Sequence, residues 1–133
     1  MNLDRRVAFG KGMLLAGLGG SVRYRPDGVN QYSQLDAHMR ALQLLPAIWY
    51  QCLRHGRELD ILITHSPPFA IHDEDTAAHQ GLKAINLLMR FARPRYHFHG
   101  HTHFYRQNLS DSVTRVGRTI VMNVFPYKLI EMN

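Results

Sequence analysis

Histidines at alternate positions across a single glycine are the part of the sequence best suited to chemistry. The segment Tyr96–His103 reads Tyr-His-Phe-His-Gly-His-Thr-His, and an earlier cluster, Thr64-His65-Ser66-Pro67-Pro68, follows an apolar run. Neutral imidazole is the commonest side-chain ligand for zinc, iron and similar ions. The pattern therefore predicts a metal site with His65, His101 and His103 as its ligands.

Two expected strands position these histidines. The isoleucine-rich run Leu59–Thr64 is typical of a strand buried on both faces, and it stops at His65 because two prolines follow. A second strand, Arg95–His99, leads into the turn at Gly100, where we expect a positive φ. Ligands of layered α/β sheets bind where the strands end, so the three histidines are expected to converge there.

His97 and His99 lie inside the second expected strand, on one of its two faces. We expect them to pack against, or form hydrogen bonds with, a neighbouring strand. His38 and His55, on or beside the expected helices, are interpreted as structural or exposed residues.

The N-terminal half of the sequence predicts a hairpin and then a helix. Val7–Phe9 and Met13–Ala16 flank a Gly-Lys-Gly turn, and a flexible glycine-rich loop over 17–21 matches no nucleotide-binding motif. A helix capped by Ser33 follows, and Pro46 ends it, kinks it or opens a second helix. Its large apolar residues are expected in the core: Leu35, Met39, Leu42, Leu45, Trp49 and Leu53.

The C-terminal half predicts a helix and several strands. The helix is expected over Ala77–Ala92, capped by Asp75 or Thr76, with Leu82, Ile85, Leu88 and Phe91 on its apolar face. Three short strands are expected after the histidine segment, over Val113–Val116, Thr119–Val124 and Lys128–Glu131. The order of elements indicates a layered α/β (α+β) domain over 1–133, with a mixed sheet, two to three helices and a C-terminal run of short strands.

Composition narrows the class of protein. The chain has 133 residues, 45% of them hydrophobic, a net charge of +6 and one cysteine, Cys52. An intramolecular disulfide and a thiolate-rich zinc site are excluded, and the cysteine usage fits a reducing, cytoplasmic compartment. The dispersed arginines fit either a solvated basic surface or attraction of a phosphate-bearing substrate. No nucleic-acid-binding motif is found, and the apolar stretch Gly12–Gly20 is too short to cross a membrane.

The motifs together resemble the second half of a calcineurin-like metallophosphoesterase. They are Thr64-His65-Ser66-Pro67-Pro68, Ile71-His72-Asp73, His79-x-Gly81 and Pro94-Arg95-Tyr96-His97-x-His99-Gly100-His101-x-His103. The resemblance implies hydrolysis of phosphate mono- or diesters by water activated between two divalent metals, such as Mn, Fe or Zn. It assigns His65 and His101 to one metal and His103 to the other. We interpret His72 and His79 as contacts of the ligands or the substrate. It also implies the C-terminal half of a four-layer α-β-β-α sandwich.

Three motifs of that family, Asp-x-His at a strand end, Gly-Asp-x-x-Asp and Gly-Asn-His, do not occur in this sequence, and its one Asp-x-His, at residues 36–38, falls in an expected helix. We therefore expect a truncated domain without a complete catalytic set, which binds at most one metal, and weakly, when alone. Asp73, Glu74 and Asp75 are interpreted as helix-capping residues or as additional ligands. A partner chain, or self-association through an exposed sheet surface, is expected to complete the domain for a phosphate-ester substrate. The alternative is a catalytically inactive metal-binding or interaction remnant of the same fold.

Overall fold

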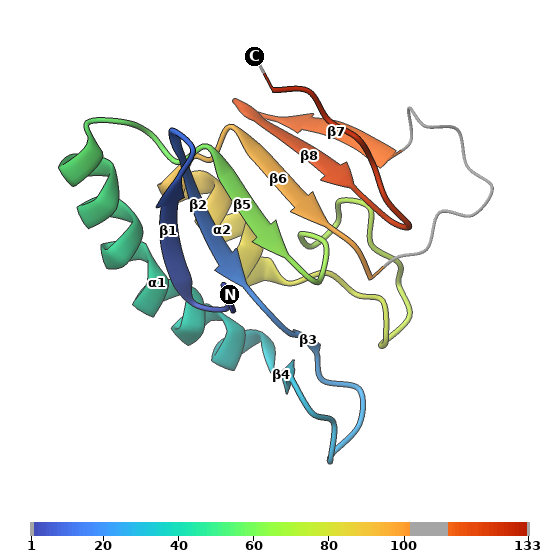
Figure 1. Cartoon of the computed structure of the whole chain (residues 1–133). Helices are drawn as coiled ribbons and strands as arrows, with labels where there is room; N and C mark the ends of the chain where they lie inside the picture. Colours follow the sequence, from blue (N-terminus) through green and yellow to red (C-terminus); the bar gives the residue numbers. More distant parts are fainter. Residues whose placement is uncertain (1, 102–111, 133) are drawn as a thin grey trace.

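A six-stranded mixed sheet with two helices forms the protein, described here from a computed structural model for residues 2–101 and 112–132 (Figure 1). The strand order is β1-β2-β5-β6-β8-β7, and a separate two-stranded sheet pairs β3 with β4. The elements are β1 Arg6–Gly10, β2 Met13–Leu18, β3 Ser21–Val22, β4 Gln31–Tyr32, α1 Gln34–His55, β5 Ile61–Thr64, α2 Lys83–Ala92, β6 Tyr96–His99, β7 Val113–Val116 and β8 Thr119–Asn123. The α/β class expected from the order of elements is confirmed.

The centre of the sheet is parallel and its two edges are antiparallel. Strands β2, β5, β6 and β8 run in one direction, whereas β1 and β7 pair antiparallel with β2 and β8. The predicted β1–β2 hairpin is present, and its two turn residues, Lys11 and Gly12, both have positive φ (51° and 74°). That combination matches the twist of the flanking strands.

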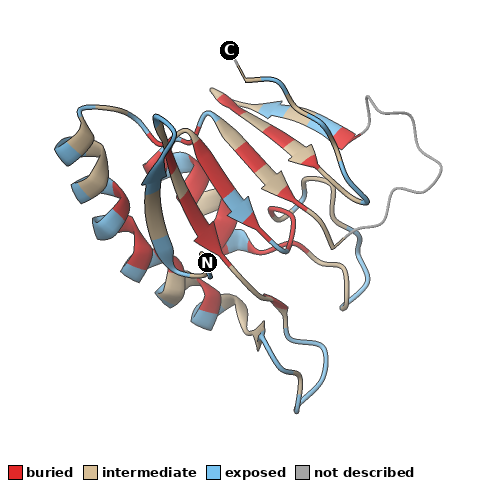
Figure 2. Ribbon diagram, viewed as in Figure 1, coloured by how far each residue is buried: buried red, intermediate tan, exposed pale blue. Residues whose placement is uncertain are grey.

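One face of the sheet packs against both helices. The register places Ala16, Leu62, His97 and Val121 side by side in one row across the sheet, and all four are buried in or beside the main core. Figure 2 shows this burial concentrated along the central strands and on the inner side of α1.

The opposite face of the sheet is also apolar, but no helix of the described residues covers it. Two rows cross it in register: Leu15, Ile61, Tyr96 and Ile120, and Gly17, Ile63, Phe98 and Met122. Ile63 is 40% exposed. The prediction that the β5 strand is buried on both faces therefore holds at Ile61, which is 5% exposed, and is wrong at Ile63.

Helix α1 begins with the predicted cap. The Ser33 side chain accepts a hydrogen bond from the Asp36 N–H, and the Asp36 carboxylate accepts one from the Ser33 N–H, which makes a capping box. The helix continues through Pro46 to His55 and ends at Gly56 in the left-handed conformation. The helix therefore neither ends at Pro46 nor begins again there.

Loss of the cap has a measurable cost. Ser33→Ala is expected to lower the free energy of unfolding by about 1 kcal/mol, because it leaves an N–H group of the first turn without its acceptor. Urea denaturation followed by circular dichroism measures the change. Ser33→Thr keeps the hydroxyl and is the control; an equal loss in both variants would show that the cap contributes nothing.

The predicted core face of α1 is wrong. Leu45 is buried, but the other large apolar residues of the predicted stripe are exposed. The buried side consists instead of Ala37, Ala41, Leu44, Leu45 and Ile48. Two alanines let the helix approach the sheet closely, so the side with small residues faces inward.

Helix α2 is shorter than predicted. It begins at Lys83 after Leu82, which provides no side-chain cap, so Asp75 and Thr76 do not cap it. The preceding segment packs against the loop after β5, where Leu82 N–H donates to Pro67 O. A Cβ at Gly81 would lie 2.2 Å from the Pro68 carbonyl oxygen, so only glycine fits this contact. Ile85 and Leu88 are buried as predicted, but Phe91 is 51% exposed.

Two further predictions are corrected. Residues Lys128–Glu131 form no strand, since they pair with no neighbour in the described residues. The glycine-rich stretch is not a free loop, because Gly17 and Leu18 belong to β2 and Asp4 accepts a hydrogen bond from the Gly19 N–H. Within the described residues, no helix has the length and apolar character needed to cross a membrane.

Candidate metal centre

His65 and His101 meet at the end of the sheet where the parallel strands finish. Strands β5 and β6 are parallel neighbours, so the loops that follow them leave the sheet side by side. The Gly100 N–H donates to the His65 carbonyl oxygen at 3.1 Å and ties the loops together. His65 Nε2 then lies 2.9 Å from His101 Nδ1. The structure thus brings together two of the three predicted ligands, while the third, His103, lies outside the described residues.

The positive φ expected at Gly100 falls on the next residue. His101 has a φ of 64°, whereas Gly100 is not in the left-handed region. The prediction at Gly100 is therefore wrong by one position. A non-glycine residue in the left-handed region costs free energy, so His101 is held there by its surroundings.

The hydrogen bonds of the histidine pair define which nitrogen atoms carry protons. His101 Nε2 faces the Ala78 carbonyl oxygen, so for neutral rings this nitrogen is the donor. His101 Nδ1 is then an acceptor, and His65 Nε2 donates to it. The Ala78 carbonyl therefore orients the His101 ring with its lone pair toward His65, as carbonyls do for metal-binding histidines.

This geometry fits two ligands of one metal ion. Zinc–imidazole bonds of about 2.0–2.1 Å at a tetrahedral angle put two ligand nitrogens about 3.3 Å apart. His65 Nε2 and His101 Nδ1 need to separate by only a few tenths of an ångström for an ion to replace the shared proton. In the described part of the chain, no group of three or more His, Cys, Asp or Glu side chains gathers around a common point.

His97 is fully buried on the helix-facing side of β6 and bonds to the strand beside it. The Thr64 hydroxyl donates to Ser66 O at 2.6 Å, so it accepts from His97 Nε2 at 2.8 Å. His97 Nδ1 is consequently unprotonated, and it has no partner in the described part of the chain. Burial, together with the neighbouring His99 and His72, lowers the pKa of His97 well below its usual value of 6.5. The predicted packing role of His97 is confirmed.

His99 and His72 form a second chain of hydrogen bonds. His99 Nδ1 donates to Gly100 O at 3.1 Å, and His99 Nε2 accepts from His72 Nδ1 at 3.0 Å. The Thr114 hydroxyl then donates to His72 Nε2 at 2.7 Å. Burial lowers the pKa of His99 to about 4. This chain links the loop that carries His101 to β7, a connection that the spacing of the sequence does not indicate.

His79 is beside the pair, and the nearby carboxylates have other partners. The His79 ring lies 5.4 Å from the His101 ring, centroid to centroid, and its Nδ1 is 3.6 Å from a Glu74 oxygen. Asp73 accepts a hydrogen bond from the Gly81 N–H at 2.8 Å. Of the residues expected around the ligands, His79 therefore approaches His101, and His72 approaches His99.

A cavity of about 400 Å³ adjoins His65 at the same edge of the sheet. Its lining includes Gly19 and Gly20 of the glycine-rich stretch, together with Asp4 and Asn30, which the sequence patterns did not single out. Burial alone would raise the pKa of Asp4, but hydrogen bonds from the Gly19 N–H and from Arg40 hold it below its usual value. The Asp4 carboxylate is therefore already paired with a cation.

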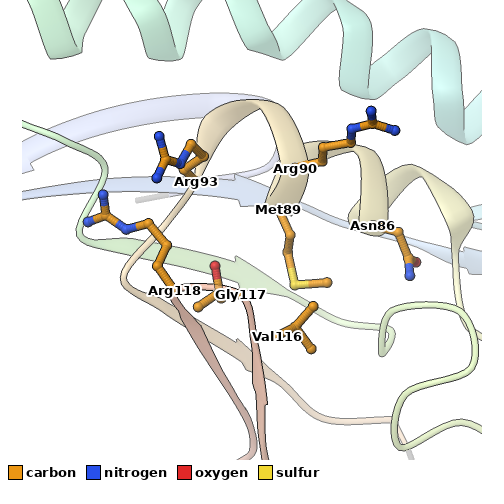
Figure 3. A pocket seen from close by; sticks show the side chains of 8 residues that line it. Asn86, Met89, Arg90, Arg93, Val116, Gly117 and Arg118 are labelled. Carbon is orange, nitrogen blue, oxygen red and sulfur yellow. The ribbon is translucent and has the colours of Figure 1, made fainter.

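A second cavity, of about 350 Å³, lies between α2 and the β7–β8 hairpin, where the parallel strands begin. Figure 3 shows Arg93 and Arg118 at one end of it and Asn86 at the other, with Met89 and Val116 between them. Arg118 forms an ion pair with Glu58, and this bond holds the pKa of the Glu58 carboxyl below its usual value. This cavity is at the opposite edge of the sheet from the histidine pair.

Comparisons with known proteins establish the fold. No protein-family model matches the chain, and no curated protein matches its sequence. Among solved structures, TT1561 of Thermus thermophilus is similar to 92% of this chain over 48% of its own length, with 19% identity and a TM-score of 0.58. Another crystal structure matches 92% of this chain over 44% of its own, with 20% identity and a TM-score of 0.56. The chain thus shares its fold with proteins of which it spans less than half the length.

Proposed function

We propose that this chain carries one side of a two-metal phosphoesterase site of the calcineurin-like metallophosphoesterase type. His65 and His101 bind one divalent ion, and His103 binds the other. The observation that carries the proposal is the 2.9 Å approach of His65 Nε2 to His101 Nδ1 where two neighbouring parallel strands end. The sequence motifs around these histidines support the same assignment.

The residues of this chain would orient the metal ligands and admit the substrate, and the metals would supply the chemistry. Two bound divalent ions lower the pKa of a water molecule and offset charge on the phosphoryl oxygens. Ala78 O holds the His101 ring, and His79 beside it is placed to contact the ligands or a substrate oxygen. The cavity next to His65 provides room for a phosphate ester, and the net charge of +6 favours its approach.

The partner that completes this site is proposed to cover the uncovered face of the sheet. That face presents two apolar rows and ends at the edge that carries His65 and His101. Two sheets that pack face to face lie about 10 Å apart, so a second sheet would bring its own strand ends to the histidines. A partner chain or a second copy could supply carboxylates there.

Metal binding tests the proposal. In calorimetric titration with Zn²⁺ or Mn²⁺, the wild-type protein is expected to bind one ion. His65→Ala and His101→Ala are each expected to weaken binding at least tenfold, since each removes a direct ligand. His38→Ala is the matched control, because His38 lies on α1 and bonds to Gln34 O. Unchanged affinity in both ligand variants would contradict the assignment.

The alternative function is an inactive metal-binding or interaction remnant of the same fold. The pairing of Asp4 with Arg40 favours it, because the carboxylate that lines the cavity beside His65 already has a cationic partner. Titration separates the two forms of the alternative. Binding without catalysis in any assembly supports a metal-binding remnant, and absence of binding in the wild type supports an interaction module.

A further inference from the structure

The outward side of α1 carries a row of large apolar side chains with a regular spacing. They recur at alternating steps of four and three residues, with Pro46 at the one step not occupied by a larger side chain. This is the 3.5-residue repeat of a seam between two packed helices. The members of the row are Leu35 (72% exposed), Met39 (51%), Leu42 (49%), Trp49 (47%) and Leu53 (84%).

The row is separate from the side of α1 that packs on the sheet, and its contact with α2 is the hydrogen bond from the Trp49 indole N–H to Phe91 O at 3.1 Å. The inner side already buries Ala41, Leu44 and Ile48 against the core. A helix that is apolar on both sides is normally buried on both sides. Since the uncovered sheet face lies on the other side of the sheet from α1, a partner that completes the metal site there leaves this row exposed.

The exposed area is sufficient for a stable interface. With about 200 Å² for a large side chain, the row and its neighbour Tyr50 expose roughly 700 Å². The largest apolar patch on a typical monomer is about 300–600 Å². A stable complex buries about 800 Å² on each partner, and the polar residues flanking the row would provide the remainder.

We propose that the row is the interface of a two-fold symmetric dimer, in which α1 packs antiparallel against α1 of a second copy of this chain. With the two-fold axis passing midway between Leu42 and Pro46, every position of the row meets another position of the row. Leu35 lies against Leu53 of the second copy, Met39 against its Trp49, and Leu42 against its Pro46. A two-fold interface must be complementary to itself in this way.

The residues that flank the row agree with the same register. On one side Asp36 faces Tyr50 of the second copy, and on the other side His38 faces its Cys52. Gln43 lies close to the two-fold axis and faces Gln43 of the second copy. In this register, no two side chains of like charge lie opposite each other along the seam. Like charges at such positions would disfavour the register.

A concave surface lies beside the row, at the place where the proposed register puts a side chain of the second copy. An apolar concavity of about 580 Å³ is lined by Trp49, Cys52, Leu53, Gly56 and Arg57, together with Glu58. In the antiparallel register, Leu35 of the second copy enters this concavity. The 22-residue helix extends about 33 Å, so the two copies contact each other over three heptads.

Light scattering after size-exclusion chromatography tests the dimer. The wild type is expected at twice its mass of 15.4 kDa, and Leu35→Glu/Leu42→Glu at 15.4 kDa, because four carboxylates would be buried against the apolar side chains of the seam. Both positions are exposed, so circular dichroism and thermal midpoint are expected to stay unchanged. The matched control is Ile63→Glu, on the uncovered sheet face, which is expected to remain dimeric.

The comparison is made in both the wild-type and the Ile63→Glu backgrounds, so association through the sheet does not hide the result. A monomer in the Ile63→Glu background at 100 µM would overturn the proposal. A dimer that survives Leu35→Glu/Leu42→Glu would overturn it as well.

Crosslinking tests the register. In a Cys52→Ser background, Gln43→Cys is expected to give a covalent dimer with a short bismaleimide, since both copies of this residue lie near the axis. Gln51→Cys, on a side of the helix away from the seam, is expected to stay monomeric. Leu35→Cys is also expected to stay monomeric, and its crosslinking would show a parallel arrangement instead.

Discussion

The metal-free protein is expected to be about 3 kcal/mol less stable at pH 4 than at pH 7, from His99 alone. Its pKa is about 4 in the folded state against a usual value of 6.5. Each pKa unit corresponds to about 1.4 kcal/mol, and at pH 5 the loss from this residue is about 2 kcal/mol. His97, whose pKa is also lowered well below 6.5, adds to the loss in the same direction.

The direction follows from where protons bind. Between pH 6.5 and 4 the unfolded chain takes up protons on these histidines and the folded chain does not. Stability is therefore complete above pH 6.5 and falls as the pH decreases. Burial is the main cause, because a charged imidazole loses its hydration inside the protein. The other cationic or titratable groups that act on His99 are His72, His101 and Lys128, and all three oppose its protonation.

Chemical denaturation in the presence of a chelator, repeated from pH 7.5 to 4.5, measures the effect. His97→Gln and His99→Gln are expected to flatten the pH dependence, and His97→Gln keeps a donor for the Thr64 hydroxyl. His38→Gln, on α1, is the control for replacing a histidine outside the buried cluster of β6. A wild-type protein equally stable at pH 7.5 and 4.5 would show that the buried rings take up protons without cost.

The central part of the candidate site was predictable because it depends only on where two neighbouring strands end. Parallel strands that are neighbours in the sheet end at the same edge, so His65 and His101 had to approach each other once β5 and β6 paired. Alternation along β6 likewise placed His97 and His99 on one face, and both side chains on that face are buried. These inferences need only the two-residue period of a strand.

The orientation of α1 was not predictable from its periodicity. The helix is apolar on two sides, and the pattern does not say which side meets the sheet. Size decided it: Ala37 and Ala41 allow close approach, whereas Leu35, Met39 and Trp49 on the other side are larger. The large residues that the pattern assigned to the core are the ones that now form the proposed dimer seam.

The other failures come from contacts between distant segments. The residues before α2 have good helix propensity at Ala77 and Ala78, but Gly81 packs against the Pro68 backbone and Ala78 O faces His101. Local propensity amounts to tenths of a kcal/mol per residue, so such contacts override it. The left-handed residue at His101 instead of Gly100 is set in the same way, by the bond from Gly100 N–H to His65 O.

Alone, the 133-residue chain is expected to hydrolyse bis-p-nitrophenyl phosphate no faster than a metal-only blank, even with excess Mn²⁺ or Zn²⁺. Two dications a few ångströms apart repel each other strongly unless anionic ligands lie between them. The histidines of this chain are neutral ligands, and Asp4, which lines the cavity beside His65, is already paired with Arg40. Without a second ion beside it, one weakly bound ion cannot contact the phosphoryl oxygens in the way that a two-metal site does.

The assay is informative only when the chain has bound metal, so it is run at concentrations that the calorimetric titration shows to be saturating. His101→Ala is the control, and it is expected to give the same baseline rate as the wild type. A metal-dependent rate in the wild type that falls at least tenfold in both His65→Ala and His101→Ala would show a working site on one chain. The half-site proposal would then be wrong, because the missing anionic ligands would have to come from this chain's own carboxylates.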